Sequence, residues 1–291
     1  MSTPRQQLRQ RITSGPTFFM AGAYDALSAL LIEQSGFDGI FTTGFGIAAS
    51  LLGRPDVELY TLTENNDVVR RITDLVSKPV FADADTGYGN VINVQRTVRE
   101  FERAGVAAIS IEDQFSPKRC PAAAATMPVV PVADAVAKIR AAVDARRDPD
   151  FLIVARTDTL DPHEAMDRAA RYAEAGADPI QPITRTFKGY DDLVKLREVS
   201  GRRLSLQLMQ GTWMADLSRE QIESVAAFAT YPIVTLMTVV TALQQNLAAL
   251  AARRTGRVDG IPCAQTTMPE FKQVIGFEAI EALQARYEQA A

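Results

Sequence analysis

Histidine and cysteine are scarce in this chain of 291 residues, which contains one histidine and two cysteines. His163 alone excludes a zinc site built on several histidines, and a serine–histidine triad would have to use that same residue. Cys120 and Cys263 do not form a disulfide framework. No apolar run approaches the length of a membrane span, and the polar residues 1–15 lack the apolar segment of a signal sequence. We therefore expect a protein of the reducing cytoplasm that does not enter a membrane.

Charge of one sign does not dominate the chain either. It carries 31 basic and 35 acidic residues, which gives a net charge of −4. This mixture gives no indication of a nucleic acid or an anionic membrane surface as partner. Apolar residues make up 47% of the sequence, enough for a sizeable core, and the length allows one large domain or two ordinary ones.

Apolar segments rich in β-branched residues recur along the chain, and segments with helical spacing lie between most of them. Eight strands that alternate with helices predict a closed (β/α)₈ barrel at this length. The main competitor, an open doubly wound sheet, requires a Gly-rich phosphate fingerprint after the first strand, where Gly22-Ala23-Tyr24-Asp25 stands instead. The predicted strands are Thr17–Ala21, Gly39–Thr43, Pro79–Ala84, Ala107–Glu112, Leu152–Arg156, Ile180–Ile183, Arg203–Leu208 and Ile233–Met237. The predicted helices are Asp25–Ser35, Leu62–Val76, Val94–Ala104, Val132–Arg146, His163–Ala175, Tyr190–Val199 and Arg219–Ala227.

The eightfold alternation ends before the last part of the chain. Thr241–Ala252 reads as a helix, a polar break follows it, and a further helical stretch runs from Glu270 to Gln289. We expect residues 1–254 to form the barrel and residues 255–291 a helical extension. This amphipathic tail packs either on its own barrel or on a neighbouring subunit.

The most informative motif is Asp-Ala-Asp-Thr-Gly-Tyr-Gly-Asn at residues 83–90, which directly follows an apolar strand. Side chains alternate along a strand, so Asp83 and Asp85 point to the same side at its end. Two close carboxylates repel each other unless a cation or a proton lies between them, and oxygen ligands suit Mg²⁺. The structural alternative is a helix N-cap followed by a glycine turn.

Polar residues also follow other predicted strands, at the barrel end where chemistry takes place in this fold. They include Thr42–Gly46, Ser110–Asp113 and Ala155–Asp158, and Asp56 stands in the loop after the second strand. A carboxylate cluster with one arginine fits an anionic oxo acid, because Arg156 can grip a carboxylate with two N–H groups. Backbone N–H groups around Gly44 and Phe45 are suited to holding an oxygen.

Together these motifs resemble the phosphoenolpyruvate mutase/isocitrate lyase superfamily, which includes methylisocitrate lyase and carboxyphosphonoenolpyruvate phosphonomutase. The resemblance covers nearly the whole chain, and the motif at 83–90 is its most specific part. It implies a (β/α)₈ barrel, usually a homotetramer, whose last helix is often exchanged between subunits. The supporting segments are Ala23–Ala29, Gly53–Asp56, Asp83–Asn90, Ser110–Asp113, Pro117–Cys120 and Ala155–Asp158.

The resemblance also implies roles for individual residues. It makes Asp83 the direct ligand of Mg²⁺, with Mn²⁺ as an alternative ion, while Asp85, Glu112 and Asp56 hold the ion through water. A small 2-oxo or 2-hydroxy acid is then the substrate, and chelation stabilises its enolate. The residues expected to bind this substrate are Tyr24, Thr43, Gly44, Phe45, Asp83, Arg156 and Gln207.

The departures from the family pattern concern the far end of the substrate. Lyases of this family carry Gly-His after the loop cysteine, whereas Pro121 and a run of alanines follow Cys120. Ile183 stands where the lyases place a glutamate, and Gln207 stands where they place an asparagine. These losses remove partners for a second carboxylate, so we expect a substrate with a less charged distal part. Arg185 and Lys188 would restore some charge if they faced the substrate.

Cys120 has two interpretations. It acts as general acid, with Lys118 or Arg119 lowering the pKa of its thiol, or it is a structural residue of a remodelled loop. Cleavage of a carbon–carbon bond through an enolate is the predicted reaction, with Cys120, Arg156 and Lys118 as the catalytic residues. Decarboxylation or hydrolysis of an oxaloacetate-like acid, phosphonate mutase chemistry and oxo-acid binding without turnover stay open.

Four further residues have structural interpretations beside functional ones. His163 reads as an exposed residue at a helix start, and Cys263 as ordinary packing. Tyr88 either lines the pocket or packs on the barrel rim. Trp213 either covers the site or anchors a loop.

Overall fold

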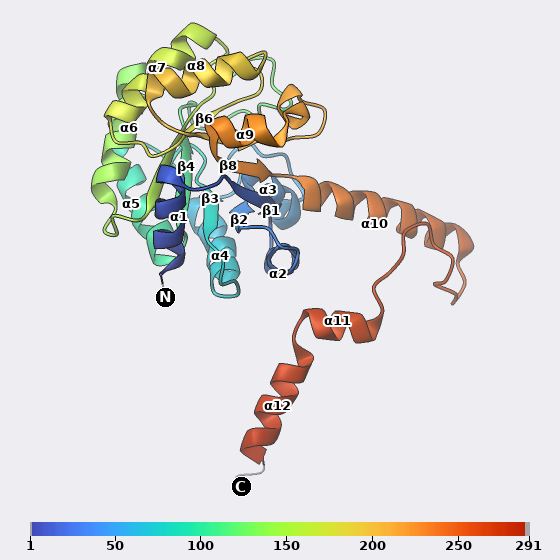
Figure 1. Ribbon diagram of the computed structural model, residues 1–291. Coiled ribbons are helices and arrows are strands. Elements are labelled where there is room, and N and C mark those ends of the chain that lie inside the picture. The colour runs from blue at the N-terminus through green and yellow to red at the C-terminus, as the bar shows by residue number, and fades with distance from the viewer. Residues whose placement is uncertain (1, 289–291) are drawn as a thin grey trace. The chain divides into compact units, whose positions relative to one another are not determined.

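A computed structural model of the chain describes residues 2–288. Eight parallel strands close into a barrel in chain order, and β8 pairs with β1 (Figure 1). The predicted (β/α)₈ fold is therefore confirmed. The strands are β1 Phe18–Ala23, β2 Gly39–Thr42, β3 Val80–Asp83, β4 Ala108–Glu112, β5 Leu152–Thr157, β6 Ile180–Pro182, β7 Leu204–Gln207 and β8 Ala226–Tyr231.

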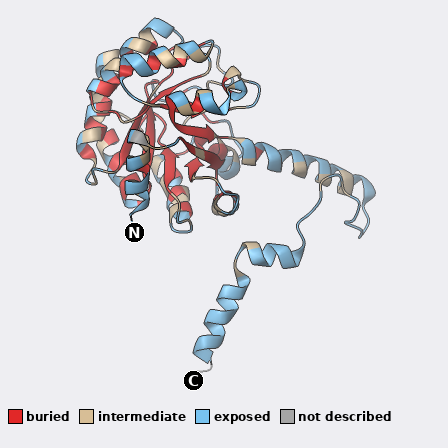
Figure 2. Ribbon diagram, viewed as in Figure 1, coloured by how far each residue is buried: buried red, intermediate tan, exposed pale blue. Residues whose placement is uncertain are grey.

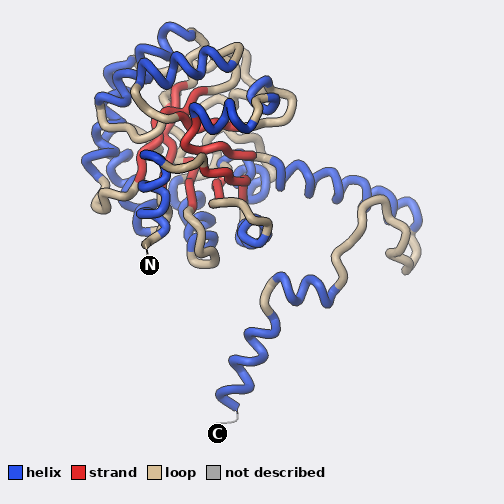
Figure 3. The backbone as a smooth tube through the Cα atoms, viewed as in Figure 1, coloured by secondary structure: helices blue, strands red, loops and turns tan. Residues whose placement is uncertain are grey.

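Helices surround these strands, as the blue and red segments of the barrel in Figure 3 show. Helices that follow β1 to β7 pack on the outside of the sheet. The helices that precede the end of β8 are α1 Pro4–Ser14, α2 Ala26–Gln34, α3 Gly44–Leu52, α4 Leu62–Thr73, α5 Val91–Arg103, α6 Val132–Ala145, α7 Pro162–Glu174, α8 Tyr190–Ser200, the short 3₁₀ helix η1 Trp213–Asp216 and α9 Arg219–Val225.

Aromatic rings fill the inside of the barrel. Phe81 of β3 lies 5.1 Å from Phe41 of β2 and 5.2 Å from Phe228 of β8, measured between ring centroids. Leu8 of α1 is fully buried in the same cluster, so α1 closes the barrel end from which the strands begin. The interior is a packed core, which leaves the carboxyl ends of the strands as the place for a site.

A second core lies between the sheet and the outer helices. The strands are therefore buried on both faces (Figure 2). In α5, Val94, Val98 and Phe101 recur at the spacing of one helix face and are fully buried. Gly22 of β1 serves close packing, because a Cβ there would lie 1.9 Å from the carbonyl oxygen of Pro232.

The eighth strand was misplaced by the sequence pattern. We predicted Ile233–Met237, but β8 is Ala226–Tyr231, and the long helix α10, Val234–Arg253, begins directly after it. The true strand is half alanine, which favours helix, whereas Ile233 and Val234 favour a strand by composition alone. Pairing with β1 and β7 outweighed this local preference. The helices α1 and α3 were not predicted.

Residues up to Leu236 form one compact unit, and residues from Met237 onward form a second. The second unit contains most of α10, followed by α11 Met268–Val274 and α12 Phe277–Glu288. The amide of Asn246 holds both the N–H and the C=O of Cys263, at 2.9 Å each. The helix predicted from Glu270 to Gln289 is broken near Gly276, because α11 ends at Val274 and α12 begins at Phe277. Gln289 lies outside the described residues.

Helix α10 passes a test of length and composition for a membrane span. Its 20 residues have a mean hydropathy of 1.4 in the best window, and only 6% of that window is buried. The expectation that no apolar stretch reaches span length is therefore wrong by this measure. The measure is weak support for a membrane, because one such helix is also found in proteins that never enter a bilayer.

Candidate active site

The two aspartates of the motif at 83–90 are brought together by a turn, not by strand alternation. Asp83 is the last residue of β3, and Asp85 lies beyond it with a positive φ of 49°. The Asp85 N–H donates to Oδ1 of Asp83 at 3.1 Å, and the Glu112 N–H donates to the Asp85 carbonyl at 2.9 Å. The carboxylates therefore share one site. Strand alternation is not the reason, because β3 ends at Asp83.

A lysine ammonium lies among these carboxylates. Nζ of Lys118 is 2.9 Å from Oδ2 of Asp56 and 2.5 Å from Oδ1 of Asp85. Lys118 and both aspartates are almost completely buried. The Lys118 N–H also donates to Oε2 of Glu58 at 2.9 Å, so backbone and side chain of this loop residue are both fixed. Lys118 was predicted to serve Cys120, and the structure shows it paired with the acidic cluster.

Arg156 is held from two sides at the end of β5. Its Nε and Nη2 donate to the two oxygens of Asp158 at 2.8 and 2.9 Å, and its Nη1 lies 2.9 Å from Oε2 of Glu112. A guanidinium carries five N–H groups, so two stay available for an incoming carboxylate. This arrangement fixes the arginine in the orientation that bidentate recognition requires.

Gln114 connects the acidic cluster to the loop that carries Cys120. Its amide nitrogen donates to Asp158 at 2.5 Å, to Glu112 at 3.2 Å and to the Arg119 carbonyl at 2.9 Å. Its amide oxygen accepts from the Arg119 N–H at 2.9 Å. Sequence analysis missed this residue, although its position directly after the Ser110–Asp113 segment could have pointed to it.

Burial dominates the electrostatics of the cluster. It raises the pKa of Asp56 to about 6, even though Lys118 acts in the opposite direction. Burial also raises the pKa of Asp83 and raises that of Glu112 well above its ordinary value. For Lys118, burial lowers the pKa, but the surrounding carboxylates outweigh this effect and raise it well above the ordinary value. The lysine therefore stays charged while the carboxylates compete for positive charge.

The first turn of α3 lies beside Asp83. A Cβ on Gly44 would come within 2.6 Å of the Tyr60 hydroxyl and 3.0 Å of Oδ2 of Asp83, so only glycine fits there. Thr43 caps the helix, and its hydroxyl accepts from the Gly46 N–H at 3.3 Å. N–H groups of a first helical turn lack partners within the helix, so Gly44 and Phe45 offer donors beside the carboxylate.

The donor set fits a divalent cation. Among residues 2–288, no three Asp, Glu, His or Cys side chains converge as direct ligands of one ion. The expected set of one direct ligand and three residues that act through water therefore stays a prediction. The buried oxygen Oδ1 of Asp56 has no hydrogen-bond partner. Lys118 and Arg156 supply two positive charges. The cluster has more carboxylates than positive charges, because its five carboxylates come from Asp56, Asp83, Asp85, Glu112 and Asp158.

The loop after Cys120 is fastened to the barrel by Arg185. Nη1 of Arg185 donates to the carbonyls of Pro121 and Ala124 at 3.0 and 2.6 Å, and Nη2 donates to Ala125 at 3.2 Å. Cys120 itself is half-buried and forms no disulfide with a described residue. Three of the five N–H groups of Arg185 are thus engaged by the loop backbone.

Other candidates fall into place around this centre. The Tyr88 hydroxyl donates to Asp85 at 2.9 Å and accepts from Asn65 at 2.7 Å. Trp213 donates to the Thr184 carbonyl at 2.9 Å and anchors a loop. Nε2 of Gln207 is buried without a partner, whereas its Oε1 accepts from Thr230 at 2.6 Å. His163 lies in the first turn of α7, outside the cluster. Tyr24 is buried beside α3, in a small cluster with Ile47 and Tyr60.

Residues 8–254 match the family model described as phosphoenolpyruvate phosphomutase. The chain belongs to the phosphoenolpyruvate mutase/isocitrate lyase superfamily. It is 35% identical to 2,3-dimethylmalate lyase of Eubacterium barkeri over 285 residues, which cover 97% of each chain. It is 41% identical to 2-methylisocitrate lyase of Salmonella typhimurium over 186 residues, which cover 62% of this chain and 63% of that one.

A solved structure of phosphonopyruvate hydrolase in complex with oxalate and Mg²⁺ has the same fold. Its TM-score to this chain is 0.86 at 32% identity, and the match covers 98% of this chain and 99% of that one. The predicted superfamily is thereby confirmed, and with it the predicted enzyme class, since the superfamily consists of carbon–carbon lyases and mutases.

Proposed function

We propose that this protein is a Mg²⁺-dependent lyase that cleaves a 2-hydroxy dicarboxylate with an uncharged distal part, of the alkyl-malate type, into a 2-oxo acid and a carboxylic acid. The observation that carries the proposal is the cluster of buried carboxylates around Asp83, in which carboxylates outnumber positive charges. The cluster adjoins Arg156 and the first turn of α3. Its neighbourhood offers a place for a cation and for an oxo-acid head together.

Asp83 would hold the ion directly, and Asp85, Glu112 and Asp56 would hold its water ligands. Mn²⁺ has the same oxygen preference and is the alternative ion. When bound, the ion would polarise the oxygens of the substrate head and stabilise negative charge that develops there. The free N–H groups of Arg156, Gly44 and Phe45 would orient the carboxylate of this head.

The chemical step balances without a further reactant. The substrate hydroxyl gives its proton to a carboxylate of the cluster, its C–O bond becomes a carbonyl, and the adjacent carbon–carbon bond breaks. The electron pair of that bond moves to the departing fragment, which is a carboxylate in its enediolate form. A proton must then reach the new carbanionic carbon, and we assign its delivery to the Cys120 thiol on the fastened loop.

The preference for a substrate with an uncharged distal part rests on the side chains expected around that part. Ile183, at the end of β6, is 9% exposed, and Arg185 is engaged with the loop backbone. A second charged group at this end would lose its hydration without a counter-charge. An alkyl-bearing substrate would not, and this supports the likeness to a dimethylmalate lyase over the likeness to enzymes of tricarboxylates.

A substrate panel tests the proposal. The panel contains 2,3-dimethylmalate, 2-methylisocitrate, isocitrate, oxaloacetate and phosphonopyruvate, each assayed with Mg²⁺ for the 2-oxo acid or other product released. We expect the alkyl malate to be cleaved with the highest kcat/KM. Tricarboxylates that turn over much better than neutral-tailed acids would contradict the distal assignment, and no turnover of any member would favour an oxo-acid binder.

Two variants distinguish the reaction types. Asp83→Ala should abolish turnover of every substrate. Cys120→Ser should lower kcat by roughly 100-fold or more if the thiol delivers the proton, while substrate affinity stays unchanged. Loss with Asp83→Ala alone would favour decarboxylation or hydrolysis of an oxaloacetate-like acid.

The second unit bears on assembly. We propose a homotetramer of the cytoplasm, free of nucleic acid and membrane, in which residues 255–291 pack on a neighbouring subunit. The support is the apolar side chains that α11 and α12 expose, since no described residue of either helix is buried. The exposed apolar side chains include Met268, Phe271, Phe277, Ile280, Leu283 and Tyr287.

A further inference from the structure

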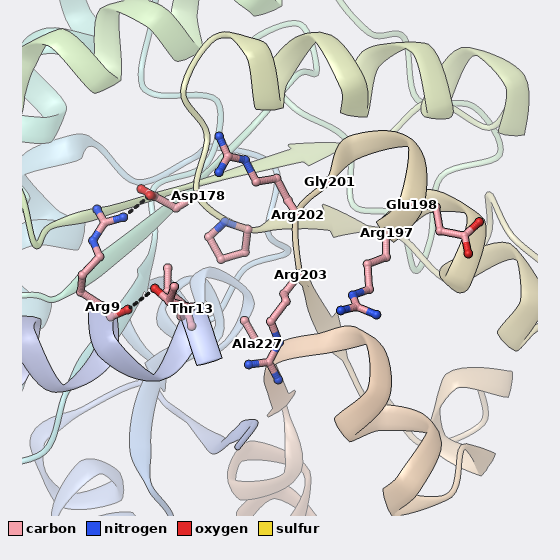
Figure 4. A pocket seen from close by; sticks show the side chains of 11 residues that line it. Arg9, Thr13, Asp178, Arg197, Glu198, Gly201, Arg202, Arg203 and Ala227 are labelled. Carbon is pink, nitrogen blue, oxygen red and sulfur yellow. Dashed lines mark hydrogen bonds and ion pairs between the residues drawn. The ribbon is translucent and has the colours of Figure 1, made fainter. Parts of the chain in front are cut away.

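A cavity of about 490 Å³ lies at the end of the barrel opposite to the carboxylate cluster. It is bordered by α1, by the end of α8 and by the residues that lead into β7 (Figure 4). The proposed reaction uses none of these residues. The cavity therefore needs an explanation of its own.

Arginine dominates its lining. Arg9, Arg197, Arg202 and Arg203 come from three different elements and surround the opening, as Figure 4 shows. Only two carboxylates line the same cavity, Asp178 and Glu198. Positive charge is therefore in excess at this place, although the chain as a whole is acidic.

The carboxylates do not neutralise this excess. Asp178 is already engaged by Arg9, by Nη1 of Arg146 at 3.0 Å and by the Ile153 N–H at 2.9 Å. Glu198 is exposed, and its side chain points away from the arginines (Figure 4). Within the described chain, neither acid forms an ion pair with Arg197, Arg202 or Arg203.

Several N–H donors around the cavity are uncommitted. The side chain of Arg197 makes no hydrogen bond or ion pair with any described residue, and the side chain of Arg202 donates only from Nη2, to the Ala173 carbonyl at 3.2 Å. Nε of Arg9 is buried without a partner. Arg203 has a structural role. It donates to the carbonyls of Arg11, Gly15 and Ala226 and so holds α1 to the barrel.

A structural explanation accounts for only part of this arrangement. Basic residues are favourable at helix C-termini, and α8 ends at this cavity. A lysine or arginine placed for that purpose usually donates to the last carbonyls, but Arg197 does not. Burial and the nearby charges of Arg197 and Arg11 lower the pKa of Arg203, so these arginines repel one another in the absence of an anion.

We propose that this cavity binds a phosphate-bearing small molecule. The guanidinium groups of Arg197 and Arg202 keep enough free N–H groups for each to donate two parallel hydrogen bonds to an anion with several oxygens. Ile12, Pro179 and Ala227 give the cavity an apolar part for the organic portion of the ligand. The volume exceeds what a single phosphate fills.

Calorimetric titration of the full chain with inorganic pyrophosphate tests the site. The buffer contains EDTA, so that no metal complex forms at the carboxylate cluster, and about 0.15 M salt to screen weak surface attraction. We expect one site per chain. Arg197→Ala and Arg202→Ala should each weaken binding about tenfold, which corresponds to loss of one charge-assisted hydrogen bond.

Arg140→Ala is the matched control. Arg140 lies on the exposed face of α6 and forms no hydrogen bond or ion pair with a described residue, so its loss should leave affinity unchanged. Arg197→Ala removes no hydrogen bond or ion pair of the described chain, which makes it the decisive variant if Arg202→Ala fails to fold. Tricarballylate serves as the carboxylate comparison and should bind more weakly than pyrophosphate.

Three results would overturn the proposal. They are the absence of pyrophosphate binding, an equal loss of affinity in Arg140→Ala, and displacement of pyrophosphate by oxalate, which would locate the anion at the carboxylate cluster. Tighter binding of tricarballylate would likewise reject a phosphate ligand.

Discussion

Nζ of Lys118 lies 2.5 Å from Oδ1 of Asp85, and both side chains are removed from solvent. The residue that begins the Cys120 loop is thus a counter-ion of the proposed metal site. Loop position and occupancy of the site are coupled through this ion pair, because the same carboxylates serve the lysine and, by our proposal, the water ligands of a divalent ion.

Lys118→Met should destabilise the metal-free protein. Removing one partner of a buried ion pair costs about 3–5 kcal/mol, because the remaining carboxylates lose their nearest positive charge. Thermal unfolding in EDTA should show a clearly lower Tm than that of the unaltered protein. Millimolar Mg²⁺ should raise the Tm of the variant more than that of the parent, and Lys188→Met, at an exposed position, serves as control.

The affinity for a divalent cation should depend on pH. Burial raises the pKa of Asp56 to about 6, so below that pH a proton competes with the ion for this carboxylate, and above it the competition ends. Affinity should therefore fall at least about tenfold between pH 7 and pH 5. Titration with Mn²⁺ across this range measures it, and an affinity that does not change between pH 5 and 7 would contradict the proposed ligand set.

Arg185→Ala should release the loop at residues 121–125. Three hydrogen bonds to backbone carbonyls are lost, while the barrel keeps its packing. We expect faster proteolytic cleavage in the loop and a kcat reduced about tenfold, with the Tm nearly unchanged. Arg140→Ala provides the comparison. If Arg185→Ala lowers the Tm clearly as well as kcat, the role of Arg185 is structural.

Truncation after Thr255 should change the assembly. If α11 and α12 cover a neighbouring subunit, their removal exposes apolar surface on that neighbour and reduces the tetramer to smaller species. Light scattering coupled to size-exclusion chromatography measures the mass. A full-length protein that is monomeric at micromolar concentration would exclude the proposed exchange.

The sequence by itself determined the barrel, its superfamily and the identity of most polar residues near the centre. Apolar segments alternating with helical ones require a parallel sheet covered on both faces, and the motif at 83–90 is specific enough to name the family. Local pattern failed at β8, where an alanine-rich strand is defined only by pairing with β1 and β7.

Only the tertiary structure decided how the polar residues divide the work. Asp85 reaches Asp83 through a residue with positive φ, Lys118 enters the acidic cluster from a loop, and Arg185 turns to the loop backbone. These relationships join residues far apart in the chain, and hydrogen-bond geometry and burial select among partners that the sequence leaves equivalent. For the same reason, the arginines around the cavity below the barrel were separate, unremarked residues until the fold brought them together.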